Sequence, residues 1–168
     1  MKLKIFFTSL ILFSFSSAYS IEADVWEYKV LPGHMNEAVV LFEEAIKLSK
    51  AAGRNTSILQ QTFGKGGEFK FHWVDFHNSL EERAKDKAYD SADYSDFITR
   101  FYASGAVTTV RSYTMTLIDD QLCNNAGVVE VYVWKSNPGM FSSVVEEFKV
   151  SREFFEKHGW EVDLWQEN

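Results

Sequence analysis

The chain has 168 residues and a formal net charge of −7, and 46% of its residues are hydrophobic. This length is sufficient for one domain with a sizeable hydrophobic core. The acidic residues are not balanced by any basic cluster, which makes the chain a poor candidate for binding nucleic acid or an anionic membrane surface.

Residues 1–20 have the three-part organisation of a bacterial secretory signal peptide. Two lysines form a basic start, an apolar stretch covers Ile5–Phe15, and small residues follow as far as Ser20. The apolar stretch is shorter than the roughly 20 residues needed to span a bilayer, which argues against a membrane anchor. We therefore predict cleavage after Ala18 or Ser20 and a periplasmic or secreted protein without an anchor. Residues 21–168 contain 15 basic and 24 acidic residues, a net charge of −9.

Cys123 is the only cysteine of the chain. It cannot form an internal disulfide, although an exported protein meets an oxidising environment. We therefore expect a free, partly buried thiol at this position.

The chain after the signal peptide begins with a predicted strand and a predicted amphipathic helix. The β-branched and aromatic residues of Val25–Val30 indicate a strand, which Pro32 and Gly33 end. From Met35 onward, apolar residues recur at spacings of three and four, as on one face of a helix, and Gly53 marks the helix end.

Two further strands and a second helical region follow. Residues 57–63 and 68–76 predict strands, and the glycine-rich turn 64–67 between them predicts a hairpin. Residues 79–104 predict a helix with an interruption near 91–93, because Ser and Asp favour helix caps over helix interiors.

A long alternating strand over 107–118 completes the order β-α-β-β-α-β, which is that of a ferredoxin-like unit. We therefore predict an α+β fold with a ferredoxin-like module over residues 21–120 and a polar linker over 121–127. Residues 128–168 predict an incomplete second module of the form β-α-β, with a strand over 128–134, a helix over 141–155 and a strand over 160–165.

The C-terminal region repeats the beginning of the first module at an offset of 106 residues. Eight of the 36 positions are identical when residues 25–60 are compared with 131–166, without a gap. The identities include the Pro-Gly pair and the glycine after the helix, and the apolar spacing of the helix also repeats. We therefore predict a duplication whose second copy ends after β-α-β.

Both copies contain an aromatic residue, three further residues, Pro-Gly and an amphipathic helix, as in Tyr28-KVL-Pro-Gly and Trp134-KSN-Pro-Gly. The segment FKFHWVDFH, residues 69–77, leads into a charged helix that contains Asp93 and Tyr94. With these features the chain resembles the dimeric α/β-barrel superfamily, in particular its NIPSNAP-like and antibiotic-biosynthesis-monooxygenase-like branches.

The resemblance covers residues 24–118 and, in part, 128–166. It implies two ferredoxin-like sheets that pair into a barrel, either in a homodimer or between the two modules, with a small-ligand pocket inside or beside the barrel. Members of the superfamily include cofactor-free monooxygenases, haem-handling enzymes and proteins of no known activity, so the fold implies no single reaction. The resemblance implies that haem-degrading members use an arrangement of Asn, Trp and His with the Trp on the second helix. The second predicted helical region of this chain contains neither Trp nor His, which argues against haem degradation. No cofactor is expected.

The strand FKFHWVDF carries large apolar residues on both faces, which predicts a sheet covered on both sides. Phe69, Phe71 and Trp73 point to one face, whereas Val74 and Phe76 point to the other. Either face could pack against the helices.

The cluster His72-Trp-Val-Asp75-Phe-His77 is the densest group of chemically active side chains. Asp75 and His77 share one face of the strand and His72 points to the other, so the three cannot converge on a metal ion in a regular strand. We expect no metal site. A purely structural alternative makes His72 a polar residue of the sheet and lets His77 lead into the cap of the second helix.

We consider His72 and His77 as candidate catalytic acid or base groups, since histidine titrates near neutral pH. The candidate residues for a ligand pocket are Tyr28, Gln60, His72, Trp73, Arg111 and Tyr113. The leading expectation is that a small, partly apolar organic molecule binds in the barrel. The alternatives are a cofactor-independent monooxygenase-like enzyme and a non-catalytic, self-associating envelope protein.

Overall fold

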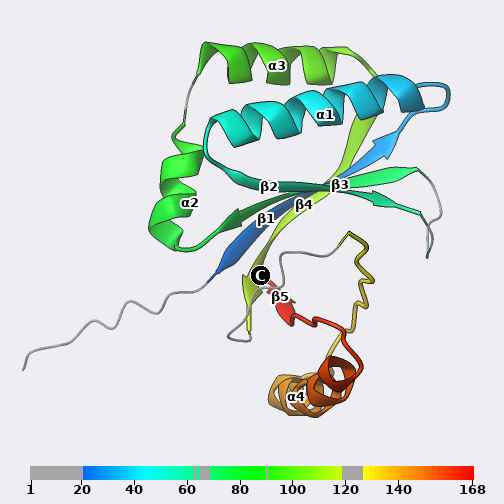
Figure 1. Ribbon diagram of the computed structural model, residues 1–168, viewed down its shortest axis with the longest axis vertical. Helices are drawn as coiled ribbons and strands as arrows, with labels where there is room; N and C mark the ends of the chain where they lie inside the picture. The colour runs from blue at the N-terminus through cyan, green and yellow to red at the C-terminus, as the bar shows by residue number, and fades with distance from the viewer. Residues whose placement is uncertain (1–20, 63, 65–68, 90, 119–126) are drawn as a thin grey trace, which may run out of the picture.

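The computed structural model describes residues 21–62, 64, 69–89, 91–118 and 127–168. The predicted signal peptide, Cys123 and most of the predicted linker lie outside these residues. The described chain is an α+β protein with four helices and one five-stranded sheet (Figure 1). Its elements in chain order are β1 (Glu22–Val30), α1 (Met35–Ala51), β2 (Asn55–Gln61), β3 (Lys70–His77), α2 (Leu80–Lys87), α3 (Ala92–Ala103), β4 (Val107–Leu117), α4 (Phe141–Lys157) and β5 (Trp165–Glu167).

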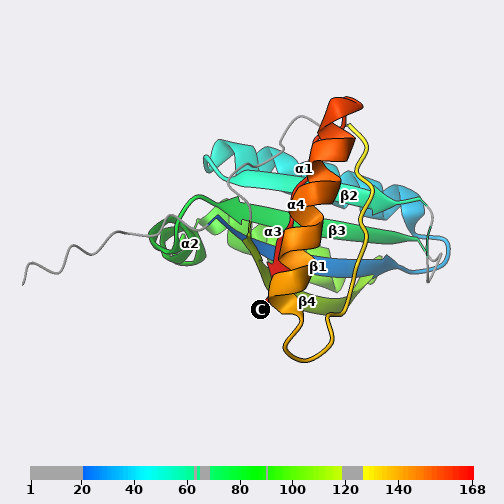
Figure 2. The same ribbon diagram turned by 90° about the horizontal axis from the view of Figure 1, so that it is seen from below.

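The strands lie in the order β2-β3-β1-β4-β5, and every neighbouring pair is antiparallel. The helices α1 and α3 cover one face of the sheet, which we call the helix face, and α4 lies on the opposite side (Figure 1 and Figure 2). We call the opposite face the far face. This arrangement is compatible with a ferredoxin-like α+β fold.

The first helix is positioned by its apolar stripe. Ala38, Leu41, Phe42, Ala45 and Ser49 are buried, at the spacing expected for one face of a helix packed on a sheet. One acidic side chain, Glu37, lies in its first turn and one basic side chain, Lys50, in its last, in agreement with the helix dipole. The sequence prediction for this helix is therefore confirmed.

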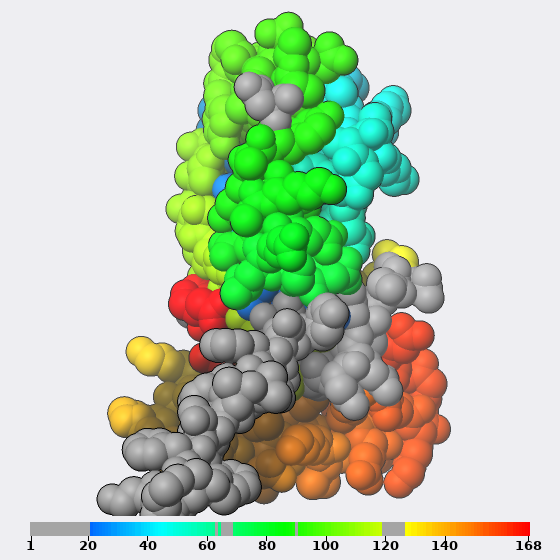
Figure 3. Space-filling model, turned by 90° about the vertical axis from the view of Figure 1, so that its left-hand side faces the viewer, coloured from blue at the N-terminus to red at the C-terminus, as the bar shows by residue number. Residues whose placement is uncertain are grey.

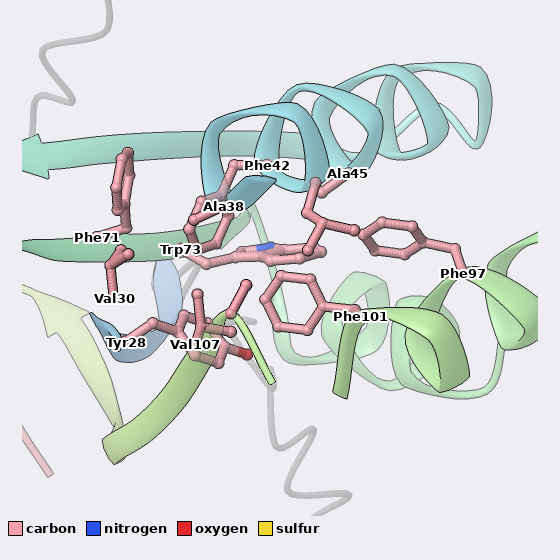
Figure 4. Close-up of a cluster of buried hydrophobic side chains, with 12 residues drawn as sticks. Tyr28, Val30, Ala38, Phe42, Ala45, Phe71, Trp73, Phe97, Phe101 and Val107 are labelled. Carbon is pink, nitrogen blue, oxygen red and sulfur yellow. The ribbon is translucent and has the colours of Figure 1, made fainter. Parts of the chain in front are cut away.

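Aromatic side chains fill the core between the helix face and the helices (Figure 4). The rings of Phe42 on α1 and Phe71 on β3 stack with centroids 4.6 Å apart, and Trp73 meets Phe101 of α3 edge-on at 6.3 Å. The aromatic face of β3 is therefore the one that packs on the helices. Val74 instead belongs to a smaller buried cluster on the far face.

The predicted interruption near 91–93 is confirmed, because two separate helices form on either side of Ser91. The Ser91 hydroxyl accepts a hydrogen bond from the backbone N–H of Tyr94 at 3.2 Å and so begins α3. Ser79 begins α2 in the same way. Unlike α1 and α3, α2 has no buried residue, so polar contacts must hold it at the end of the sheet.

A β-bulge in β4 changes which side chains reach each face. The register between β1 and β4 shifts after Glu27, at Val110 of β4. Val107 is buried in the core on the helix face, whereas Arg111 contacts Glu27 on the far face. In a regular strand, residues four apart point to the same face. Because of the bulge, the Val107 side chain points into the core and the Arg111 side chain points to the far face, although both belong to β4.

The C-terminal region differs from its prediction. Residues 128–134 were expected to form a strand, and this prediction is wrong: they form no strand, and Val128 is 84% exposed. The strand expected over 160–165 is reduced to β5, which pairs only with β4. The expected helix is present as α4, but none of its residues is buried. A strand needs a neighbour for its backbone N–H and C=O groups, and none lies beside 128–134 in the described chain.

A helix that crosses a bilayer must be both long and apolar. None of the helices within the described residues is both long enough and apolar enough to do so.

Candidate functional site

Three side chains on adjacent strands form a polar row across the far face. The register places Glu27 of β1 opposite His72 of β3 on one side and opposite Arg111 of β4 on the other. The Arg111 Nε–H donates to Glu27 Oε2 at 3.0 Å, and Lys70 Nζ donates to Glu27 Oε1 at 2.6 Å. The Glu27 side chain is only 8% exposed, so this carboxylate is a nearly buried charge with two cationic partners.

The Arg111 guanidinium joins this row to an aromatic ring. It lies over the ring of Tyr113, 4.2 Å from the centroid, in the geometry of a cation–π contact. Glu167 of β5 approaches the same guanidinium at 3.4 Å. The Arg111 side chain nevertheless remains 47% exposed, so part of its hydrogen-bonding capacity faces solvent.

His72 is biased toward its neutral form. Burial of the ring lowers the pKa of His72 below its usual value, and the positive charges of Lys70 and Arg111 lower it further, while Glu27 acts in the opposite direction. At neutral pH the ring therefore has one nitrogen that can donate a hydrogen bond and one that can accept a proton.

Burial and charge also act on Glu27 in the row and on Tyr113 beside it. Burial would raise the pKa of Glu27, but hydrogen bonds from Lys70 and Arg111 outweigh it, and the pKa is lowered. Burial of the Tyr113 phenol raises its pKa, so this hydroxyl stays protonated at neutral pH. The row and its neighbours Lys70 and Tyr113 therefore combine an ionised carboxylate, two cations and two neutral polar rings.

An apolar patch adjoins the polar row on the same face. Ala23, Val25 and Val74 are buried there, with Phe76, Tyr113, Met115 and Trp165 packed against them. The rings of Phe76 and Trp165 lie 5.9 Å apart, which ties β5 to β3 across the far face. We call the polar row and this patch together the far-face cluster. It offers aromatic surface next to an accessible guanidinium and a neutral imidazole.

A second polar cluster lies on the opposite face of the sheet, where α2 covers the end of the strands (Figure 3). Arg83 of α2 donates to both oxygens of Asp24, at 2.6 and 3.0 Å, and to the hydroxyl of Thr114 at 2.9 Å. The His77 Nδ1 lies 3.1 Å from a carboxylate oxygen of Asp86. These contacts explain how α2 is held without any buried apolar residue.

Asp24 is the electrostatic centre of this second cluster. Burial would raise the pKa of its carboxyl, but the hydrogen bonds and charge of Arg83, with Lys87 and Thr114, lower it to about 2. His77 Nε2 lies 3.4 Å from Asp24 and makes no hydrogen bond within the described structure. The side chain of His77 is 3% exposed, so it has almost no direct access for a ligand from solvent.

The structure brings three of the six pocket candidates together and separates the others. His72, Arg111 and Tyr113 share the far face, whereas Tyr28 and Trp73 lie in the core under the helices. The Tyr28 hydroxyl is 3.3 Å from that of Tyr102. Burial is the main cause that raises the pKa of Tyr28, and the contact with Tyr102 raises it further. Neither ring can line a site with residues of the far face.

The remaining pocket candidate, Gln60, also lies away from the far-face cluster. Gln60 is exposed on the edge strand β2 and shares a face with Phe71 in the core. Of the two catalytic candidates, His72 belongs to the far-face cluster and His77 to the cluster beneath α2.

Sequence reasoning missed the two acidic residues that organise these clusters, Glu27 and Asp24. Both lie in β1, whose residues are nearly all buried. A charged residue within a strand flanked by apolar positions is a usable signal, because a buried carboxylate requires a cationic partner. Glu27 has the partners Lys70 and Arg111, and Asp24 has the partner Arg83. These cationic residues lie on other strands or on α2 and come near only in the folded chain.

The structure separates His72 from Asp75 and His77. His72 lies on the far face, and the other two lie on the helix face. The Asp75 carboxylate accepts hydrogen bonds from the Trp73 indole N–H at 2.9 Å and from the Thr56 hydroxyl at 2.5 Å. In the described part of the chain, no group of three or more His, Cys, Asp or Glu side chains is arranged to hold a metal ion.

Comparison of the chain with protein-family models, with curated proteins and with solved structures found no match. The chemistry of the far-face cluster is therefore the basis for assigning a function.

Proposed function

We propose that this protein binds a small, partly apolar organic molecule on the far face of its sheet, and that β1 to β4 form a ferredoxin-like module of the dimeric α/β-barrel type. The observation that carries the proposal is the far-face cluster, in which a half-exposed guanidinium, a neutral imidazole and aromatic side chains share one surface. Ligand sites in proteins commonly combine an apolar lining with a few oriented polar groups.

The cluster defines the chemistry of the ligand. The apolar patch that includes Trp165 and Phe76 suits a ring or short hydrocarbon body. Arg111 is already paired with Glu27 through Nε and with Glu167 through Nη1, and its N–H groups on Nη2 suit an acidic or carbonyl oxygen. His72 can accept or donate a further hydrogen bond. The ligand class is therefore an aromatic or short-chain acid or a similar oxygenated molecule.

A fluorescent dye of this class tests the proposal. Anilinonaphthalene sulfonate combines aromatic rings with an anionic sulfonate, and we expect saturable binding with increased fluorescence. Arg111→Gln should weaken the affinity about ten-fold, because it removes one charge-assisted contact worth about 1.5 kcal/mol. Arg100→Gln is the matched control. Arg100 lies on α3 and pairs with Glu44 on α1, away from the far face.

The contrast between the two arginine variants decides the outcome. If the dye bound only to exposed apolar side chains elsewhere, its affinity would be the same for Arg111→Gln and Arg100→Gln. Equal affinities for wild type and Arg111→Gln would remove the basis of the proposal. Native mass spectrometry of the purified protein, with and without the dye, gives the stoichiometry independently of fluorescence.

A cofactor-independent monooxygenase-like activity is the second candidate, and the lowered pKa of His72 favours it. A neutral imidazole beside an ionised carboxylate is suited to remove a proton from a bound phenol. Tyr113, on the same face, would orient such a substrate, whereas Trp73 lies beneath the helices and would not. Oxygen uptake with hydroquinone as the probe substrate tests this function. A rate that His72→Gln leaves unchanged would exclude His72 as the base.

A further inference from the structure

The strongest unexplained feature of the molecule is its C-terminal arm, which we define as residues 128–160. Of the 19 large hydrophobic residues that are exposed in the described chain, 12 lie in these 33 residues. They include Val131 at 74% exposure and Trp134 at 65%. Soluble monomers rarely expose apolar side chains at this density, and such surfaces commonly mark a contact with another protein.

The arm has the local geometry of the first part of the chain. Its helix α4 has 17 residues, as α1 has, and begins 106 residues later. The glycine before each helix has a positive φ, 86° for Gly33 and 77° for Gly139, and the glycine after each helix does too, 72° for Gly53 and 82° for Gly159. The same pattern of residues therefore produces the same turns and the same helix.

The two regions differ in the segment before the helix. β1 forms a strand because β3 and β4 lie on either side of it. The equivalent segment at the same offset, 128–136, forms no strand, and in the described structure no strand lies beside it. The sequence VVEVYVW, rich in β-branched and aromatic residues, is suited to a strand. What it lacks is a neighbour.

The sheet has one edge that could supply this neighbour. β2 is an outer strand of seven residues, NTSILQQ, with no charged residue and no proline. Natural edge strands are usually protected by charges, prolines, bulges or short length, and β2 has none of these features. The opposite edge is protected, because β4 carries a bulge and Arg111 and because β5 has only three residues.

The arm of one copy does not pair with its own β2. β5, which follows the arm in sequence, is paired with β4 at the edge of the sheet opposite to β2. Figure 2 shows the segment before α4, in yellow and orange, running across the direction of the strands instead of alongside them. The intervening strands β3, β1 and β4 separate the two edges.

We infer that the occupant of this edge is a second copy of the chain: residues 128–134 of each copy add a strand to β2 of the other. Each copy supplies one arm and one unprotected edge, so a two-fold axis satisfies both at once, as an isologous dimer requires. Backbone hydrogen bonds provide the contact in β-strand addition, and the apolar side chains of the arm add buried surface. This inference does not depend on the proposed ligand site.

Chain exchange between two disabled variants provides the test. Val131→Pro disables the arm, because proline removes a backbone donor from a new strand. Leu59→Lys combined with Gln60→Lys disables the edge, because lysines on an edge strand oppose pairing. Sedimentation or light scattering should give twice the monomer mass for the wild type and the monomer mass for each variant alone.

Mixing the two variants should restore a dimer, because the intact arm of one variant meets the intact edge of the other. This heterodimer has one interface instead of two and should therefore dissociate at higher concentration than the wild-type dimer. Val40→Lys is the control, since Val40 is an exposed apolar residue of α1 and should leave the mass unchanged. Circular dichroism and tryptophan fluorescence establish that each variant has folded.

Three results would overturn the inference. A monomeric wild-type protein at micromolar concentration would mean that the arm has no second copy as its partner. Variants that remain dimeric would place the contact elsewhere on the molecule. Two monomeric variants that stay monomeric when mixed would exclude the exchange of arms and edges.

Discussion

The contact between Asp24 and Arg83 makes the stability of the protein depend on pH in a range that can be calculated. Asp24 lies on β1 and is surrounded by Arg83 and Lys87 of α2, His77 of β3 and Thr114 of β4. Its pKa falls from 3.8, the value for an unperturbed aspartate, to about 2 in the folded protein. The folded state therefore holds this proton less tightly than the unfolded state does.

The sign of the effect follows from this difference. Above pH 3.8 the carboxylate is ionised in both states and its full contribution is present, and this contribution is lost as the pH falls toward 2. A difference of nearly two pKa units corresponds to about 2 kcal/mol of unfolding free energy. Asp24→Asn should therefore lower the stability at pH 7 by about 2 kcal/mol and should remove this part of the pH dependence.

Urea unfolding followed by tryptophan fluorescence at pH 7, 5, 3 and 2 measures both effects. The control is Glu44→Gln, which removes a carboxylate paired with Arg100 on the exposed surface of the helices, where solvent screens the charges. We expect no resolvable change from it at pH 7. If the wild type and Asp24→Asn lose the same free energy between pH 5 and pH 2, the assigned role of Asp24 is incorrect.

Three further predictions concern the core, a helix cap and the far face. Phe42→Ala should lower the unfolding free energy by about 3–5 kcal/mol, because Phe42 is 2% exposed and packs against Phe71; a loss below about 1 kcal/mol in urea titration would contradict this packing. Ser91→Ala should lower the unfolding free energy by about 1 kcal/mol and leave the affinity for the dye unchanged. Ser91→Asp should keep the helix cap and therefore the melting temperature of the wild type. His72 should titrate below pH 6.5 in NMR spectra, with its resonance assigned by its loss in His72→Gln. Protein stability should decrease as the pH falls below 6.5, because the folded state disfavours the charged ring. A titration midpoint above 6.5 would contradict the burial of this ring.

Local sequence patterns were sufficient to predict β1 to β4 and the helices α1 and α3. The spacing of apolar residues on α1 and the serine at position 91 act within a few residues, so the helix and the interruption could be read directly. The face of β3 that packs on the helices could not be read, because both faces are apolar. It depends on which of them matches Tyr28 of β1 and Phe42 of α1 in three dimensions.

The error at residues 128–134 has a different physical origin. Strand propensity describes side chains that fit a pleated surface, but a strand forms only where another strand satisfies its backbone groups. VVEVYVW has the side chains of a strand, but in the described structure no strand lies beside it. The same limit applies to the far-face cluster, in which Glu27 is joined to Lys70 and Arg111 by strand pairing that the local sequence does not encode.

The bulge at Val110 has a consequence for how this chain can change length. Deleting Val110 would restore regular alternation in β4, so that either Val107 leaves the core or Arg111 and Tyr113 turn away from the far face. A substitution at Val110, which is 48% exposed, alters only one side chain, whereas the loss of one residue reverses the orientation of a whole segment. β4 should therefore accept many residue types at this position but should not tolerate a change in the number of residues between Val107 and Arg111.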